Sequence, residues 1–124
     1  MNKQFLILVG ALCVVSVYTL FQIGSPNRPI RSGVSYSHDI RPILETRCGT
    51  CHIGNITSAD LHMDSYEDLL AGSENGPVIL PGNAHDSLLV KKILAGEMPK
   101  RGPKLTPAQV QMIMDWIEAG APRD

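Results

Sequence analysis

Two cysteines and a histidine within five residues are the part of this chain whose types and spacing could do chemistry. Cys48 and Cys51 stand at i and i+3, so on a helical turn both sulfurs lie on the same side. There they can form thioethers with the two vinyl groups of one porphyrin, and His52 can bind its iron through a ring nitrogen. We therefore interpret CGTCH as the attachment site of one covalent haem c, with His52 as the proximal iron ligand.

Two other kinds of site use the same cysteine spacing. A thioredoxin-like dithiol belongs to a βαβ unit, and this chain has no alternating strand pattern of useful length. A four-ligand zinc site needs a second pair of ligands at finger-like spacing, and His38, His62 and His85 are too scattered to supply it. The spacing therefore favours haem attachment over both alternatives.

An uncharged apolar stretch, residues 5–23, precedes this motif and follows the single charge of Lys3. It is close to the roughly 20 residues that cross a bilayer as a helix, and it is long for the apolar region of a signal peptide. We expect an uncleaved transmembrane anchor over 5–23, with residues 1–4 in the cytoplasm and a cleavable signal peptide as the alternative. Cys13, inside the stretch, is interpreted as a small membrane-embedded apolar residue.

The position of the haem motif determines the expected orientation. Haem c is attached outside the cytoplasmic membrane in bacteria, so the chain beyond the anchor must be exported. We expect a single-pass protein of the cytoplasmic membrane whose C-terminal domain lies in the periplasm or outside. Residues 24–34, which mix proline, glycine and serine, form the predicted linker, and residues 35–124 form the predicted domain.

The predicted domain is poor in large apolar side chains. Both phenylalanines lie in the anchor, which leaves Tyr36, Tyr66 and Trp116 as the aromatic residues of 35–124. A protein-only core is marginal for a domain of about 90 residues, and a haem would supply the missing bulk. The domain carries eight basic and twelve acidic residues, a formal charge of −4, which disfavours nucleic-acid binding.

Apolar periodicity and capping residues predict four helices and no strand, so the expected fold class is all-α. The first helix should begin after Ser37 or Asp39 and lead into the cysteines. The other three are expected at about 65–72, 87–94 and 106–120.

The last predicted helix has the strongest local signal. Thr106 and Gln109 form a capping box, with Pro107 in the first helical position. The expected buried stripe of this helix consists of Val110, Ile113, Met114 and Ile117.

Iron in a low-spin electron carrier needs a second axial ligand, usually methionine or histidine. Met98 stands in the loop GEMP just after a predicted helix end, where the following proline favours an extended backbone. Met114, in contrast, belongs to the predicted core stripe of the last helix. We predict Met98 as the distal ligand, with His62 and Met63 as the alternatives.

From Tyr36 to Pro122 the chain resembles the planctomycete-type cytochrome c domain, a branch of the class I cytochromes c. The resemblance rests on DIRPIL before CGTCH, on LHMDSYEDLLAG with GPVILPGN and SLL, and on GEMP followed by LTPAQVQMIMDWIEAGAP. It implies a class I helical domain around one covalent haem at Cys48 and Cys51, with His52 as proximal and Met98 as distal ligand.

The chain departs from the family pattern at three sites. Ala59-Asp60 stands where paired glycines are usual, Lys100 replaces a common second proline, and Ile53 replaces a small or polar residue. These departures affect loop residues and leave the four implied haem-binding residues intact.

These features predict a membrane-anchored monohaem c-type cytochrome that transfers single electrons at the periplasmic face of the cytoplasmic membrane. Its expected partners are redox proteins, and its expected membrane contact is the N-terminal helix. No nucleophile–base pair or paired catalytic carboxylates can be argued from the sequence, so an electron-transfer protein is favoured over an enzyme. The alternative is a haem-based sensor or peroxidase-like protein in which Met98 is a labile ligand.

Overall fold

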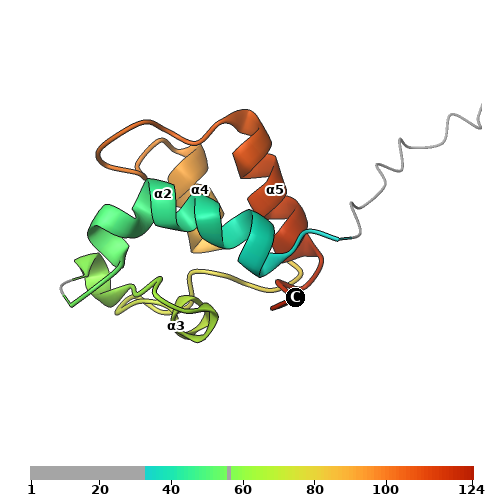
Figure 1. Cartoon of the computed structure of the whole chain (residues 1–124), viewed down its shortest axis with the longest axis horizontal. Coiled ribbons are helices and arrows are strands. Elements are labelled where there is room, and N and C mark those ends of the chain that lie inside the picture. The colour runs from blue at the N-terminus through green and yellow to red at the C-terminus, as the bar shows by residue number, and fades with distance from the viewer. Residues whose placement is uncertain (1–32, 56) are drawn as a thin grey trace, which may run out of the picture.

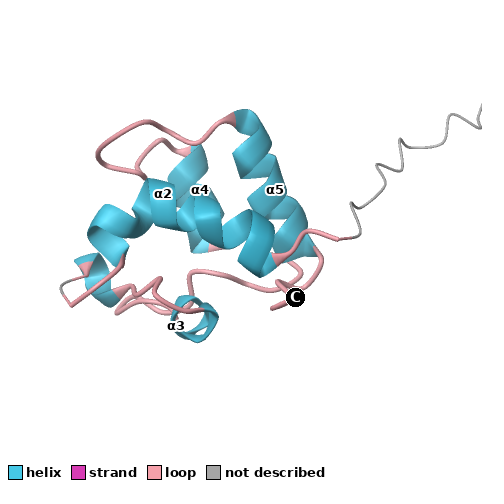
Figure 2. Cartoon of the chain, viewed as in Figure 1, coloured by secondary structure: helices cyan, strands magenta, loops and turns pink. Residues whose placement is uncertain are grey.

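The computed structural model describes residues 33–55 and 57–124 (Figure 1). The predicted anchor at 5–23 and most of the predicted linker at 24–34 lie outside the described residues. Within the described ranges, no helix combines the length and the apolar character that a membrane crossing demands. Helices and loops make up this part of the chain (Figure 2), which confirms the prediction of an all-helical domain for the described residues.

The first helical segment starts earlier than the sequence predicted. A π-helical turn, η1 (Tyr36–Ile40), leads directly into α2 (Arg41–His52). Its cap is Ser35, whose Oγ accepts a hydrogen bond from a backbone N–H of the first turn. The prediction of a cap at Ser37 or Asp39 was wrong, because Asp39 instead accepts a hydrogen bond from the N–H of Ser35 at 2.9 Å.

The other three predicted helices lie close to their predicted positions, and two of them begin at a side-chain cap. Ser65 caps the second of these by accepting from a backbone N–H, and Thr106 and Gln109 form the predicted capping box. The structure adds a short 3₁₀ turn, η2 (Ser58–Asp60), that the sequence did not reveal. The three helices are α3 (Tyr66–Ala71), α4 (Leu88–Leu94) and α5 (Pro107–Glu118).

The buried face of α5 differs from the predicted stripe. Ile113, Trp116 and Ile117 are the fully buried side chains of this helix, whereas Val110 and Met114 are half-buried. The i, i+3, i+4 spacing was therefore correct, but the helix is rotated so that the indole takes the inner position.

Trp116 is fixed by a hydrogen bond as well as by burial. Its Nε1 donates to the carbonyl of Pro122 at 2.8 Å, and its ring lies 5.7 Å from that of Tyr36 in η1. The indole thereby joins α5 to η1 and to the C-terminal segment, and buried aromatic groups of this kind dominate the packing energy of small cores.

Two segments flank α2, one helical and one irregular. In the view of Figure 1, α3 lies on one side of α2, and the long loop between α4 and α5 arches on the other side. α4 and η1 both pack against α5, which forms the frame that carries these segments.

Ala59 and Asp60, which stand where planctomycete-type cytochrome c domains usually have glycines, both adopt the left-handed conformation, with φ of 57° and 52°. For residues other than glycine this conformation costs roughly 1–2 kcal/mol each. The carbonyl of Ala59 accepts from the N–H of Glu74 at 3.0 Å, which holds the turn in place.

Ala59→Gly should therefore stabilise the protein by about 1 kcal/mol, because relief of the left-handed strain outweighs the added freedom of the unfolded chain. The free energy of unfolding, measured in guanidinium chloride, checks this. Ala108→Gly, at an exposed position of α5, is the matched control and should destabilise by up to about 1 kcal/mol. An equal loss of stability in both variants would contradict the argument.

Candidate functional site

The three motif residues occupy the last turns of α2. Cys48 and Cys51 are partly buried and form no disulfide, and His52 is the last residue of the helix, with 7% of its surface exposed. The helix ends at His52 because Ile53 turns into an extended conformation while its N–H still donates to the carbonyl of Gly49 at 3.1 Å.

A backbone carbonyl orients the imidazole of His52. Its Nδ1 lies 3.1 Å from the carbonyl oxygen of Leu61. A carbonyl can only accept, so in this contact Nδ1 carries the proton and the lone pair of the neutral ring is on Nε2. Histidines that ligate metals use this arrangement, in which one ring nitrogen donates to a carbonyl and the other is free to bind.

The chain beyond α2 is tied back to the same residue. The N–H of Met63 donates to the carbonyl of His52 at 2.7 Å, and the N–H of Gly54 donates to Asp64 at 3.0 Å. These bonds hold the segment 61–64 against the end of α2, which keeps the Leu61 carbonyl in reach of the ring. The sequence could not reveal the role of Leu61, because the acceptor is a backbone carbonyl and every residue type has one.

Burial raises the pKa of the Cys48 thiol to about 11, and the neighbouring Cys51 adds to the rise. At neutral pH this thiol is protonated. Redox-active dithiols depend on a thiol whose pKa is lowered toward neutrality. The surroundings of Cys48 therefore do not activate this thiol.

Two further observations concern what the site could hold. Within the described ranges, no three histidine, cysteine, aspartate or glutamate side chains gather in a way that could hold a metal ion. Directly before Cys48, the buried Nε of Arg47 has no hydrogen-bond partner among the described residues. Buried polar atoms are normally paired, so this donor beside the motif lacks the acceptor that it would ordinarily have.

Met98 lies on a separate segment, the loop between α4 and α5. It is half-buried, and its N–H donates to the carbonyl of Lys92 in α4 at 3.1 Å. The other methionines of the described chain belong to the hydrophobic core: Met63 is buried, and Met112 and Met114 pack against it. Among the described methionines, Met98 is the one that is not part of the hydrophobic core.

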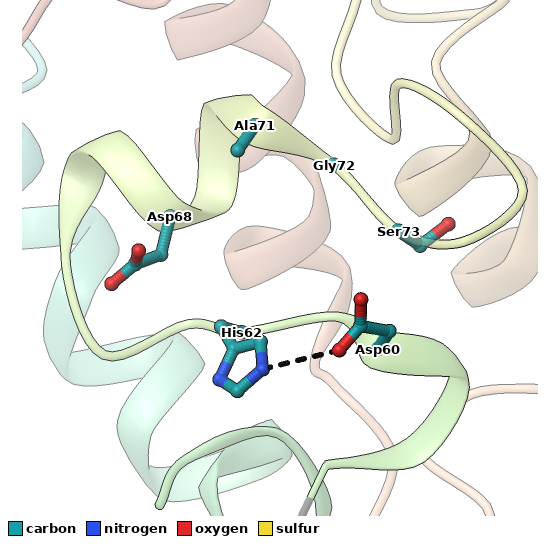
Figure 3. Close-up of a pocket in the computed structure, with 6 residues that line it drawn as sticks. All are labelled: Asp60, His62, Asp68, Ala71, Gly72 and Ser73. Carbon is teal, nitrogen blue, oxygen red and sulfur yellow. Dashed lines mark ion pairs between the residues drawn. The ribbon is translucent and has the colours of Figure 1, made fainter.

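His62, an alternative distal ligand, is held by its own surroundings. Its Nε2 lies 3.4 Å from Asp60 and 3.2 Å from the hydroxyl of Thr57, and its Nδ1 lies 3.7 Å from Asp64. It lines an open pocket of about 230 Å³ with Asp60, as Figure 3 shows. Both ring nitrogens therefore face partners of the 57–64 segment.

The structure places the three motif residues on α2 and Met98 on the α4–α5 loop. No hydrogen bond joins these two segments among the residues that the structure describes. A ligand bound by residues of both segments would therefore connect two parts of the fold that no hydrogen bond joins.

Comparison with known proteins gives one match. Residues 48–102 match the family model described as planctomycete cytochrome C. The matched segment begins at Cys48 and contains His52 and Met98, and it confirms the resemblance to a planctomycete-type cytochrome c domain. The C-terminal motif of the resemblance, beyond residue 102, lies outside the match. No curated protein and no solved structure matches the chain.

Proposed function

We propose that this protein is a membrane-anchored monohaem c-type cytochrome that passes single electrons to and from redox proteins. The observation that carries the proposal is the oriented imidazole of His52, which ends the CGTCH helix inside a segment that matches a cytochrome family. A haem bound there would supply one-electron chemistry at its iron, and the protein residues would bind and orient it.

Each residue of the motif has a distinct part in this proposal. Cys48 and Cys51 form the thioethers, one helical turn apart on the same face of α2. His52 binds the iron through Nε2, while the Leu61 carbonyl fixes the tautomer and makes the ring more basic.

Met98 is proposed as the distal ligand, because its side chain is half-buried and is not part of the hydrophobic core to which the other described methionines belong. A thioether ligand favours the ferrous state, so the potential should be higher than with two histidines. This fits an electron carrier whose two ligands stay bound through the redox cycle.

The membrane anchor is proposed from the sequence alone. An apolar stretch at 5–23 that follows a positively charged N-terminus is close to the length of a membrane span. Since haem c is attached outside the cytoplasmic membrane, the domain would work in the periplasm or outside, tethered by the linker at 24–34.

Met98→Ala should abolish the weak band at the red end of the ferric spectrum that a Met–Fe bond produces. The variant should also bind CO readily in the ferrous state, because an open position replaces the sulfur ligand. Met63→Leu and Met114→Leu are the controls, and both should keep the band because these side chains serve the core. A Met98→Ala protein with unchanged spectrum and potential would overturn the assignment in favour of Met63 or His62.

The full-length protein should stay with membranes after a salt wash, with a mature N-terminus near Met1. Replacement of residues 1–24 by a cleavable signal peptide should release the haem-bearing domain into the periplasmic fraction. Fractionation with N-terminal sequencing checks this. A full-length protein that appears in the soluble fraction and begins near residue 25 would mean that the stretch is a signal peptide.

A further inference from the structure

One lysine spans the loop that carries Met98. The ammonium group of Lys104 donates to the carbonyl of Gly96 at 2.9 Å and also to the carbonyl of Pro99. These two carbonyls lie on either side of Met98 in the chain. The contact therefore closes the loop around the residue proposed as distal ligand.

The lysine connects this loop to the rigid frame of the domain. Leu105, the next residue, packs against the hydrophobic core, and Thr106 caps α5. On the other side, the carbonyl of Lys92 in α4 accepts from the N–H of Met98 at 3.1 Å. Met98 is thus held from α4 through the backbone and from the start of α5 through the Lys104 side chain.

The loop needs such a contact because its backbone is otherwise permissive. Gly96 and Gly102 both have positive φ, 70° and 78°, and residues 95–106 contain no helix or strand. Hydrogen bonds from a charged donor are stronger than neutral ones, and an ammonium group can donate to two carbonyls at once.

The other lysines of this region do not share the role. Lys91 pairs with Asp86 at 3.2 Å, and Lys92 pairs with Glu97. Lys100 is exposed in the same loop and makes no hydrogen bond or ion pair within the described part of the chain. Lys100 therefore provides a matched comparison with the same charge and nearly the same location.

We propose that Lys104 is a positioning residue that holds Met98 in place as the distal iron ligand. The proposal rests on the proposed function, since it requires the iron and its Met98 ligand. Lys104 lies just beyond the segment that matches the family model. Its role is to keep the loop closed, so that the sulfur rebinds faster than an external ligand can enter.

The test uses the haem-loaded full-length protein and the variants Lys104→Leu, Lys104→Arg and Lys100→Leu. Two quantities are measured: the intensity of the ferric band at the red end of the spectrum and the rate of CO binding to the ferrous protein. Lys104→Leu should weaken the band and speed CO binding about tenfold, equivalent to roughly 1.4 kcal/mol. Lys104→Arg, which keeps a charged donor, should stay close to wild type, and Lys100→Leu should change the rate by less than about twofold.

Equal CO-binding rates in Lys104→Leu and Lys100→Leu, with the band unchanged in both, would overturn the positioning role. Absence of the band in the wild-type protein would instead refute the proposed Met98 ligation. A failure of the positioning role is therefore distinguishable from a failure of the proposed ligand. If Lys104→Leu does not load haem, Lys104→Gln replaces it. Faster CO binding in Lys104→Gln than in Lys104→Arg supports the proposal, and equal rates in these two variants overturn it.

Discussion

The hydrogen bond between the His52 ring and the Leu61 carbonyl is the contact on which the rest of the site depends. It determines which ring nitrogen carries the proton and which is left free to bind a metal. It also requires the chain after α2 to turn back by residue 61. The bond from the Met63 N–H to the His52 carbonyl secures that return. The left-handed turn at Ala59 and Asp60 leads into the same segment, so backbone strain is accepted where the chain must reverse.

The two sides of the proposed haem site are built differently. On the side of α2, the imidazole is held by backbone hydrogen bonds and by burial, which gives a rigid ligand. Met98, in contrast, lies in the α4–α5 loop, which has no regular structure. Its N–H donates to the Lys92 carbonyl, and the Lys104 ammonium group bonds the carbonyls of Gly96 and Pro99 on either side of it in the chain. With both residues as the proposed iron ligands, ligand exchange should begin with Met98 and leave His52 bound.

The sequence predicted those features of the fold that depend on neighbouring residues. The caps at Ser65 and Thr106 were predictable because the capping hydrogen bonds join residues three apart. The cap at Ser35 was missed, because a π-helical turn extends the first helix backwards. Trp116 was missed from the α5 stripe, because its inward position follows from packing against Tyr36 and the C-terminal segment.

The same distinction holds for the site. The types and spacing of Cys48, Cys51 and His52 indicate a chemistry directly. The Leu61 carbonyl and the Lys104 bridge have no such pattern, because they depend on how an irregular loop folds back on backbone carbonyls five to nine residues away. The turn at Ala59 and Asp60 could be predicted in part. The comparison with the family pattern indicated that glycines are usual at these two positions, and the positive φ of both residues explains that preference.

Covalent attachment of haem is the central claim, and denaturing extraction tests it most directly. Purified protein is denatured in acid acetone, and the polypeptide mass and the haem in each fraction are measured. The account predicts that haem stays on the wild-type chain, as one haem mass added to the polypeptide, and that no haem remains attached when Cys48 and Cys51 are both replaced by alanine. Haem that leaves the wild-type chain freely in the solvent, or a polypeptide mass without it, would contradict the account.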